Sequence, residues 1–276
     1  MKKLEVLMSV MHQSDFSIAY KSKIDSDLLI INQCDVDRYD ECEVDGHLWR
    51  MISTTDRGLS KSRNMAIDNA RGDVCLLCDD DEVFVPGYAE GILRAYEEIG
   101  CASAVVFNVE RINYTMKKTY YKITETRETP KYRGYSSQML SFDLKQIREH
   151  GIRMNERFGS GTEWGGGEEI LFEQDIKKSG LRLYEHPFTI STVDYAGGSA
   201  WFHGYDEKYF YNLGAFIGFQ FRRNIVLREL RILMTCYRLR REKTLSVCKK
   251  IRWMHIGGRQ FKKDVPFAAY MEGRKR

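Results

Sequence analysis

The sequence predicts an α/β fold, with a mostly parallel sheet, flanking helices and a basic helical region at the C-terminal end. Short apolar runs alternate with helical patterns over most of the chain, as in proteins with parallel sheets. The run VCLLC at 74–78 is apolar throughout, as expected for a strand covered on both faces. Residues 1–200 carry 25 Lys and Arg against 33 Asp and Glu, whereas residues 201–276 carry 18 against 6. We therefore expect an acidic catalytic domain over 1–205 and a basic amphipathic region over 206–276.

The individual elements follow from hydrophobic periodicity and from glycine and proline signals. Apolar runs predict strands at 4–11, 28–31, 50–54, 74–78, 102–107 and 181–184. Helical patterns predict helices at 59–70, 88–99 and 168–179, each with a glycine one or two residues after its end. The polar, Tyr-rich stretch 110–150 predicts a hairpin or a crossing strand. Beyond about residue 205 the pattern is helical, aromatic and basic.

The cysteines and the N-terminus bear on location. The chain has seven scattered cysteines, and its one CxxC lies inside the apolar run 74–78. No second ligand pair stands at zinc spacing, so the pattern is typical of reduced, buried thiols in a cytoplasmic protein. The apolar stretch at 4–11 is interrupted by Glu5 and lacks a cleavage site, which favours a first strand over a signal peptide. No run of about 18 apolar residues predicts a spanning helix.

Three consecutive acids, Asp79, Asp80 and Asp81, come directly after the predicted strand 74–78. Ligands of open parallel sheets bind outside the carboxyl ends of the strands, which is where this run is expected. Adjacent carboxylates repel each other, and a hard cation such as Mg²⁺ or Mn²⁺ prefers carboxylate oxygens and bridges to phosphates. The run therefore predicts a metal and diphosphate site, with a solvated acidic turn as the alternative.

Two blocks of sequence then carry a resemblance. DRGLSKSRNMAIDNARGDVCLLCDDDEVF and WGGGEEILFEQDIKKSGLRLY resemble, in the same order, the landmarks of family 2 glycosyltransferases of the GT-A fold. The first block matches the family's Arg-Asn helix, apolar strand and DxD motif, and the second matches its Gly-Glu-Asp helix. Together the resemblance covers roughly residues 4–205. It implies an inverting, metal-dependent hexosyltransferase-like enzyme that uses a nucleotide-sugar donor.

The resemblance also implies roles for individual acids. Asp79 and Asp81 match the two acids of DxD, with Asp81 the first candidate for metal ligand and Asp79 and Asp80 beside the donor diphosphate. Glu169, preceded by Glu168, matches the general base, although the family usually has Asp there. A helix N-terminal acid stabilised by the dipole is the alternative for this residue. His203 is a candidate for completing the metal shell, and an ordinary surface histidine is the competing interpretation.

Four further residues are expected at the nucleotide. Arg63 and Asn64 match the family's Arg-Asn pair, and Arg57 is placed to contact the diphosphate. Many family members have an Asp pair after the second strand that recognises the base; this chain has Asn-Gln-Cys-Asp at 32–35, so we assign base contact to Gln33 and prefer a uracil nucleotide. In the Gly-rich stretch 158–167, which is expected to close over the donor, Trp164 is either a stacking platform for an acceptor sugar or a packing aromatic.

The segment FIGFQFRRNIVLRELRILMTCYRLRR, in the basic region, interleaves apolar residues with arginines. Such a segment can lie on an anionic membrane, which would suit a lipid-linked saccharide acceptor at the inner face of the cell membrane. A solvated helix packed on the domain and a self-association surface are alternatives. No recognition motif supports nucleic acid. With the family resemblance, this predicts a peripheral bacterial enzyme of surface-polysaccharide biosynthesis.

Two other functions were weighed. A nucleotidyltransferase also uses acids and Mg²⁺ at a strand end, but it would usually show a Gly-rich phosphate loop after the first strand, and MSVMHQSDF has none. A non-catalytic protein that binds polyanions or membranes through the basic region leaves the acidic run and the two glutamates unexplained. The glycosyltransferase is therefore the function that the sequence favours.

Overall fold

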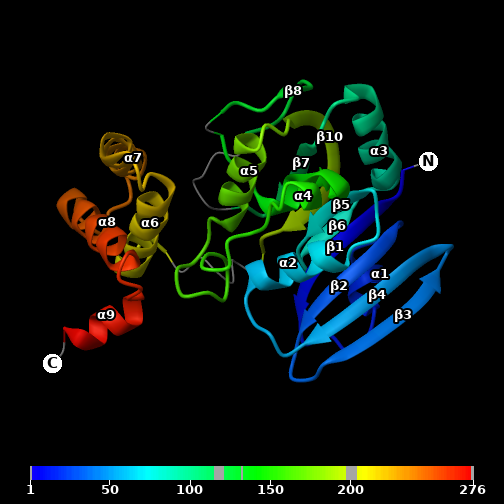
Figure 1. The fold of residues 1–276 in the computed structure, drawn as a ribbon, viewed down its shortest axis with the longest axis horizontal. Helices are drawn as coiled ribbons and strands as arrows, with labels where there is room; N and C mark the ends of the chain where they lie inside the picture. The colour runs from blue at the N-terminus through cyan, green and yellow to red at the C-terminus, as the bar shows by residue number, and fades with distance from the viewer. Residues whose placement is uncertain (1, 115–120, 132, 197–203, 275–276) are drawn as a thin grey trace. The chain divides into compact units, whose positions relative to one another are not determined.

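The computed structural model describes residues 2–114, 121–131, 133–196 and 204–274 (Figure 1). The described chain divides into two compact units. The first, called the sheet unit below, comprises 1–156 and 168–198, and the second, the helical unit, comprises 157–167 and 199–276. The predicted boundary at 205 lies close to the end of the sheet unit, but the Gly-rich stretch packs with the helical unit.

The sheet unit contains a ten-stranded sheet in which the strand order is β3-β4-β2-β1-β5-β9-β7-β10-β6, with β8 paired to β10. The strands are β1 (Leu4–Met11), β2 (Asp27–Gln33), β3 (Arg38–Val44), β4 (His47–Thr54), β5 (Val74–Cys78), β6 (Glu82–Phe84), β7 (Ala104–Ile112), β8 (Arg127–Glu128), β9 (Leu140–Asp143) and β10 (Leu183–Asp194). β1 pairs in parallel with both β2 and β5, and β2 pairs in parallel with β4. The predicted α/β class is thus confirmed.

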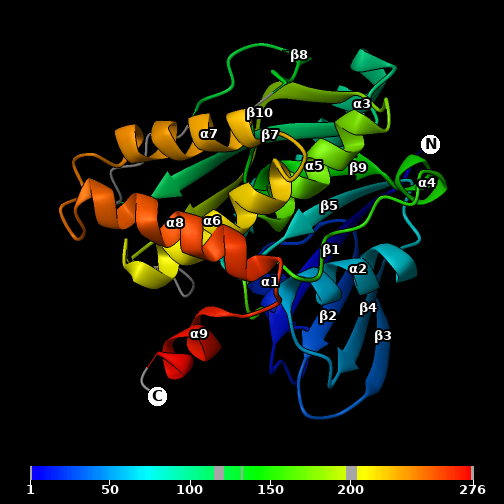
Figure 2. The same cartoon turned by 60° about the vertical axis from the view of Figure 1, so that its left-hand side comes forward.

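Helices cover both faces of this sheet (Figures 1 and 2). They are α1 (Ser17–Lys21), α2 (Leu59–Asn69), α3 (Tyr88–Ile99), α4 (Leu144–Glu149) and α5 (Glu168–Lys178), with a 3₁₀ turn η1 (Ser137–Met139). Side chains alternate across the strands, so Met8 of β1 joins the core under α1 and α3, while Leu7 joins the core under α2, α4 and α5. All five side chains of β5 are buried, as the sequence predicted.

Strands β3 and β10 differ from the prediction, whereas the stretch 110–150 agrees with it. The polar strand β3 forms an antiparallel hairpin with β4, and its exposed and half-buried residues carry no apolar run that would have revealed it. The stretch 110–150 was expected to hold a hairpin or a crossing strand, and it supplies β9, which lies antiparallel between β5 and β7. Strand β10 is 12 residues long, because its pairing with β7 continues through two register shifts beyond the predicted 181–184.

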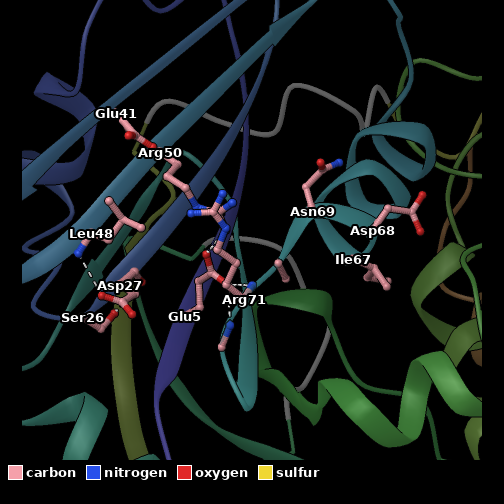
Figure 3. Close-up of polar contacts among 12 residues, drawn as sticks. Glu5, Ser26, Asp27, Glu41, Leu48, Arg50, Ile67, Asp68, Asn69 and Arg71 are labelled. Carbon is pink, nitrogen blue, oxygen red and sulfur yellow. Dashed lines mark hydrogen bonds and ion pairs between the residues drawn. The ribbon is translucent and has the colours of Figure 1, made fainter.

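A buried ion pair closes the amino-terminal end of the parallel strands (Figure 3). Glu5 of β1 pairs with Arg50 of β4, and both side chains are nearly inaccessible. The second oxygen of Glu5 accepts hydrogen bonds from the backbone N–H of Arg71 and, at 2.8 Å, from that of Gly72. A Cβ on Gly72 would lie 2.7 Å from the Cβ of Glu5, so only glycine fits there. These residues lie at the end of the sheet opposite the acidic run and fix the turn into β5.

The helical unit contains α6 (Glu207–Gln220), α7 (Ile225–Arg238), α8 (Val247–Phe261) and α9 (Phe267–Gly273). α6 and α8 approach closely at glycines, because a Cβ on Gly214 would lie 2.0 Å from the carbonyl oxygen of Met254. A cluster of aromatic rings, including Phe158, Tyr211 and Phe261, forms the core of this unit. The expected helical, basic region is therefore present. Within the described ranges, no helix has the length and apolar character needed to cross a membrane.

Candidate active site in the sheet unit

The acidic run lies at the carboxyl end of β5, as the sequence predicted. Since β5, β1, β2 and β4 run parallel, their ends at Cys78, Met11, Gln33 and Thr54 meet at the same edge of the sheet. The strand order reverses around β1, with β2 on one side and β5 on the other. Ligands of open α/β sheets bind in the crevice at such a point.

Arg63 of α2 joins the acidic run to the start of α5. Its side chain is buried; Nη2 donates to Asp79 Oδ1 at 2.8 Å, and Nη1 donates to Glu168 Oε1 at 2.9 Å. Nη2 also donates to the hydroxyl of Ser137, in η1, at 2.8 Å. Burial alone would lower the pKa of Arg63, but the charges of Asp79, Glu168 and Glu169 outweigh it and raise that pKa. One guanidinium therefore holds the carboxylates of Asp79, 16 residues further along the chain, and of Glu168, 105 residues further along.

Glu168 and Glu169 occupy the first turn of α5, where the helix dipole favours negative charge. Glu168 is 5% exposed and Glu169 is half-buried. Burial and the neighbouring charge of Glu168 raise the pKa of Glu169 to about 8, and a hydrogen bond from its protonated form to Glu168 adds to the shift. Glu169 therefore holds its proton more strongly than an ordinary carboxyl group, which is a property of groups that accept and release protons in catalysis.

The three acids of the run differ in their surroundings. Asp79 is half-buried against Arg63, whereas Asp80 and Asp81 are exposed at the turn. Partial desolvation and the charges of Asp79 and Asp80 raise the pKa of Asp81 to about 6. Desolvation and Asp79 also raise the pKa of Asp80. The protein thus holds negative charges together at a cost, which a bound cation would relieve.

Two residues that shape the run were not predicted. Gln138 Nε2 donates to Asp81 Oδ1 at 3.0 Å, and Glu82 accepts hydrogen bonds from the backbone N–H of Asp79 at 3.2 Å and from the Ser191 hydroxyl at 2.7 Å. Glu82 is 1% exposed, and burial raises its pKa well above the usual range. No motif marks Gln138, whose position depends on β9 and η1. Glu82 had only its place beside the run as a signal.

The donor set fits a hard divalent cation. Asp79 and Asp81 offer carboxylate oxygens, the ligands that Mg²⁺ and Mn²⁺ prefer. In the described part of the chain, no group of three or more His, Cys, Asp or Glu side chains is arranged to hold a metal ion. A cation here would thus take its other ligands from a diphosphate and from water, as Mg²⁺ commonly does. His203, the third predicted ligand, lies outside the described residues.

The residues expected at the nucleotide are engaged in protein contacts. Gln33, which is 6% exposed, accepts a hydrogen bond from the backbone N–H of Gly58 at 2.7 Å. Arg57 is exposed and donates to the carbonyl oxygen of Cys34 at 2.8 Å and to Asp35 Oδ1 at 2.7 Å. These bonds, with one from Arg57 to the carbonyl oxygen of Thr54 at 3.2 Å, tie the ends of β2 and β4 to the loop that enters α2.

Asn64 faces a different partner from its neighbour Arg63. Its amide nitrogen donates to the carbonyl oxygen of Met154 at 3.0 Å and to Glu156 Oε1 at 2.9 Å, and its amide oxygen accepts from the backbone N–H of Met154 at 2.8 Å. The side chain is 2% exposed. Asn64 therefore anchors the segment that precedes the Gly-rich stretch, a contact that the sequence did not predict.

Trp164 is a packing aromatic. Its side chain is 2% exposed and lies parallel to the ring of Tyr211, at a centroid distance of 6.0 Å, and edge-on to Phe261 at 4.8 Å. Of the two alternatives for this ring, the structure supports packing, because the side chain is buried against aromatic rings of the helical unit.

Comparison with known protein families identifies the family of this chain. The sequence model of the family "Glycosyl transferase family 2" matches residues 5–165, more than half of the chain. The chain is a family 2 glycosyltransferase. The matched range includes the acidic run and Arg63 and ends just before Glu168. The comparison with curated protein sequences returned no match.

Solved structures resemble this glycosyltransferase in fold. Residues 1–349 of S. aureus TarS in complex with UDP-GlcNAc align with a TM-score of 0.59 at 14% identity, over 80% of this chain and 67% of that one. The same range of TarS in complex with UDP aligns with a TM-score of 0.55 at 13% identity, over 88% and 72%. A longer TarS structure aligns with a TM-score of 0.58, and the chain spans 44% of its length. At these identities the likeness establishes the GT-A fold alone.

Proposed function

We propose that this enzyme is an inverting, metal-dependent glycosyltransferase that moves a sugar from a nucleotide-sugar, with UDP as the first candidate, to a saccharide hydroxyl. The observation that carries the proposal is the Arg63 bridge, which holds Asp79 and Glu168 at one edge of the sheet. A carboxylate site for the donor diphosphate and a carboxylate base for the acceptor are then close together. The UDP and UDP-GlcNAc complexes of TarS, a protein of the same fold, support the choice of donor class.

In this proposal Glu169 is the general base. As the acceptor oxygen attacks the anomeric carbon, its proton passes to the Glu169 carboxylate, and the bond between that carbon and the diphosphate oxygen breaks on the opposite side. One displacement of this kind inverts the configuration. Glu168, fixed by Arg63 at 2.9 Å, positions the first turn of α5 and raises the proton affinity of Glu169.

Asp79 and Asp81 are proposed to hold Mn²⁺ or Mg²⁺ with the donor diphosphate. A bound cation supplies neutralisation of the charge that develops on the departing nucleoside diphosphate. Arg63 keeps Asp79 oriented, and Gln138 does the same for Asp81. The donor region is proposed to include four further residues: Asp80, Arg57, Asn64 and Gln33. Asn64 and Gln33 contribute to it through the backbone segments that they fix. His203 stays proposed as a further ligand.

The setting is proposed from the charge of the helical region. Residues 201–276 carry 18 Lys and Arg against 6 Asp and Glu, which favours binding to an anionic membrane surface. We place the enzyme at the cytoplasmic face, with a lipid-linked saccharide of a bacterial surface polysaccharide as acceptor. The catalytic role is assigned to 1–205 and the docking role to 206–276. Family membership decides against the nucleotidyltransferase and the non-catalytic binding protein.

The test is calorimetric titration of UDP, GDP and CMP into the purified protein with and without Mn²⁺, on the wild type and on Asp81→Ala. We expect one nucleotide to bind, only with metal, and the variant to lose that binding while keeping its circular dichroism spectrum. Equal binding with and without Mn²⁺ would reject the metal dependence. Absence of binding by every nucleotide to folded protein would reject the donor site.

A further inference from the structure

Most large apolar side chains of helix α7 are not buried in the core of its own unit. Seven large apolar residues of this helix are exposed, of which Ile225, at its start, lies apart from the rest. The other six have exposed fractions of 44–67%: Val226, Leu227, Leu230, Leu233, Met234 and Tyr237. We call these six residues the apolar face of α7. Members of this face are three, four or seven residues apart in the sequence, as in Leu227 and Leu230 or Leu230 and Tyr237. Such spacings place side chains on one side of a helix. A surface helix of a soluble protein normally has the opposite arrangement.

The other side of α7 packs on its own unit. Ile232 and Cys236, one turn apart, are 2% and 4% exposed and are the buried residues of this helix. Ile232 follows Leu230 by two residues, and Cys236 follows Met234 by two. Since two residues along a helix correspond to a rotation of about 200°, the buried side chains point away from Leu230 and Met234. Figure 2 shows α7 as a straight helix that lies beside α8. Within the described part of the helical unit, 157–167 and 204–274, α7 is therefore held by one side, and its apolar face stays exposed.

Basic residues surround this face. Arg222 and Arg223 precede the helix, Arg231 and Arg238 lie along one flank, and three more follow it: Arg240, Arg241 and Lys243. None of these seven forms an ion pair with an acidic side chain in the described ranges, where Glu229 is paired with Arg228 and His255. The face is thus a strip of aliphatic groups bordered by positive charge that its own unit leaves uncompensated.

We infer that α7 is an interfacial helix that lies in the plane of an anionic lipid bilayer, with its apolar face among the acyl chains and the flanking arginines at the phosphates. The inference rests on the membrane setting proposed above and names the element responsible. With 14 residues the helix is about 21 Å long, too short to cross a hydrocarbon core of about 30 Å, so it lies flat. Amphipathic helices with aliphatic and basic faces bind interfaces in this way.

The charges favour lipid over the other partners. A symmetric pairing of two copies through this face would bring two basic borders together, and like charges at an interface oppose association. Single-stranded nucleic acid is bound by stacking on aromatic rings, whereas five of the six side chains here are aliphatic. An anionic bilayer matches both the apolar strip and its border.

The experiment is co-sedimentation of the full chain with phosphatidylglycerol–phosphatidylcholine vesicles and with pure phosphatidylcholine vesicles. The test variant is Leu230→Ser/Leu233→Ser, which removes apolar surface without changing charge. Ile112→Ser is the matched control, because Ile112 is 46% exposed but lies in the sheet unit. We expect wild type and control to bind the anionic vesicles and the double variant to bind them at least about tenfold more weakly. Arg231→Gln/Arg238→Gln should weaken binding to the anionic vesicles only.

Other outcomes separate this inference from the proposed function. If the wild type and the double variant bind equally, another surface docks the enzyme and the α7 inference is overturned. If the wild type binds no vesicles and forms a concentration-dependent dimer that the double variant abolishes, the face is a self-association surface. If it neither binds nor dimerises and the double variant melts at a lower temperature, the face is covered within the chain. Metal-dependent UDP binding, measured without vesicles, tests the transferase independently.

Discussion

Nη1 of Arg63 lies 2.9 Å from Oε1 of Glu168, and the two side chains are 2% and 6% exposed. A buried ion pair of this kind is expensive to desolvate, and its presence is weak evidence for stability. Here the same guanidinium also contacts Asp79. The pair therefore sets the position of two acids that the proposed reaction needs, and its effect should be visible in rate as well as in folding.

Replacing Arg63 by Met should leave the buried Glu168 and the half-buried Asp79 without this counter-charge. We expect the free energy of unfolding to fall by about 3–5 kcal/mol, as for other broken buried pairs. Arg63→Lys keeps the charge but loses the two-armed geometry, so kcat should fall well below wild type with a smaller loss of stability. Urea denaturation and initial rates test this. Wild-type kcat and stability in Arg63→Lys would show that the fork is unnecessary.

Glu169 and Glu168 can be separated by a matched pair of substitutions. Glu169→Gln should lower kcat about 10²–10⁴-fold, the range for loss of a general base, while leaving UDP affinity near wild type. Glu168→Gln removes the partner of Arg63, so we expect weaker donor binding and lower stability together with a smaller direct loss in kcat. If Glu168→Gln is the variant that loses the chemical step with intact binding, the base assignment is reversed.

The raised pKa of Glu169 gives two pH dependences with defined signs. The base must be ionised, so kcat/KM should rise with pH, reach half its maximum near pH 8 and level off above that pH. Stability should change in the opposite direction: the folded state holds the proton more tightly than the unfolded state, so ionisation costs folding energy between about pH 4.5 and 8. The melting temperature of Glu169→Gln should therefore fall less over this range than that of the wild type. Parallel melting curves would contradict the shift.

The sequence predicted what depends on local pattern. The buried strand β5, the helix α2 and the acidic run that follows β5 were visible because apolar runs, glycines and consecutive acids are local signals. The contact of Arg63 with Glu168 could not be predicted as a contact, because it joins residues that only the sheet topology brings together. Only the resemblance placed both residues in one site.

The burial of individual side chains also could not be predicted from the sequence. The resemblance placed Asn64 at the nucleotide, and the sequence left Trp164 open between stacking on a sugar and packing. Both side chains are 2% exposed and engaged by protein groups. Strand β3 was missed because an edge strand with solvated faces needs no apolar alternation. In α7, by contrast, the amphipathic pattern was visible, but only the structure shows that its apolar side faces away from its own unit.

The contact between α6 and α8 gives the last prediction. A Cβ on Gly214 would lie 2.0 Å from the carbonyl oxygen of Met254, a backbone atom that cannot move without displacing α8. Gly214→Ala should therefore lower the free energy of unfolding by about 1–3 kcal/mol or more, as overpacking does. Gly273→Ala is the matched control, because the structure shows no described atom within 4 Å of its Cβ position. We expect the control to be neutral or slightly stabilising, since alanine favours the helix. Thermal unfolding of both variants is the measurement, and equal melting temperatures would mean that the two helices separate at little cost.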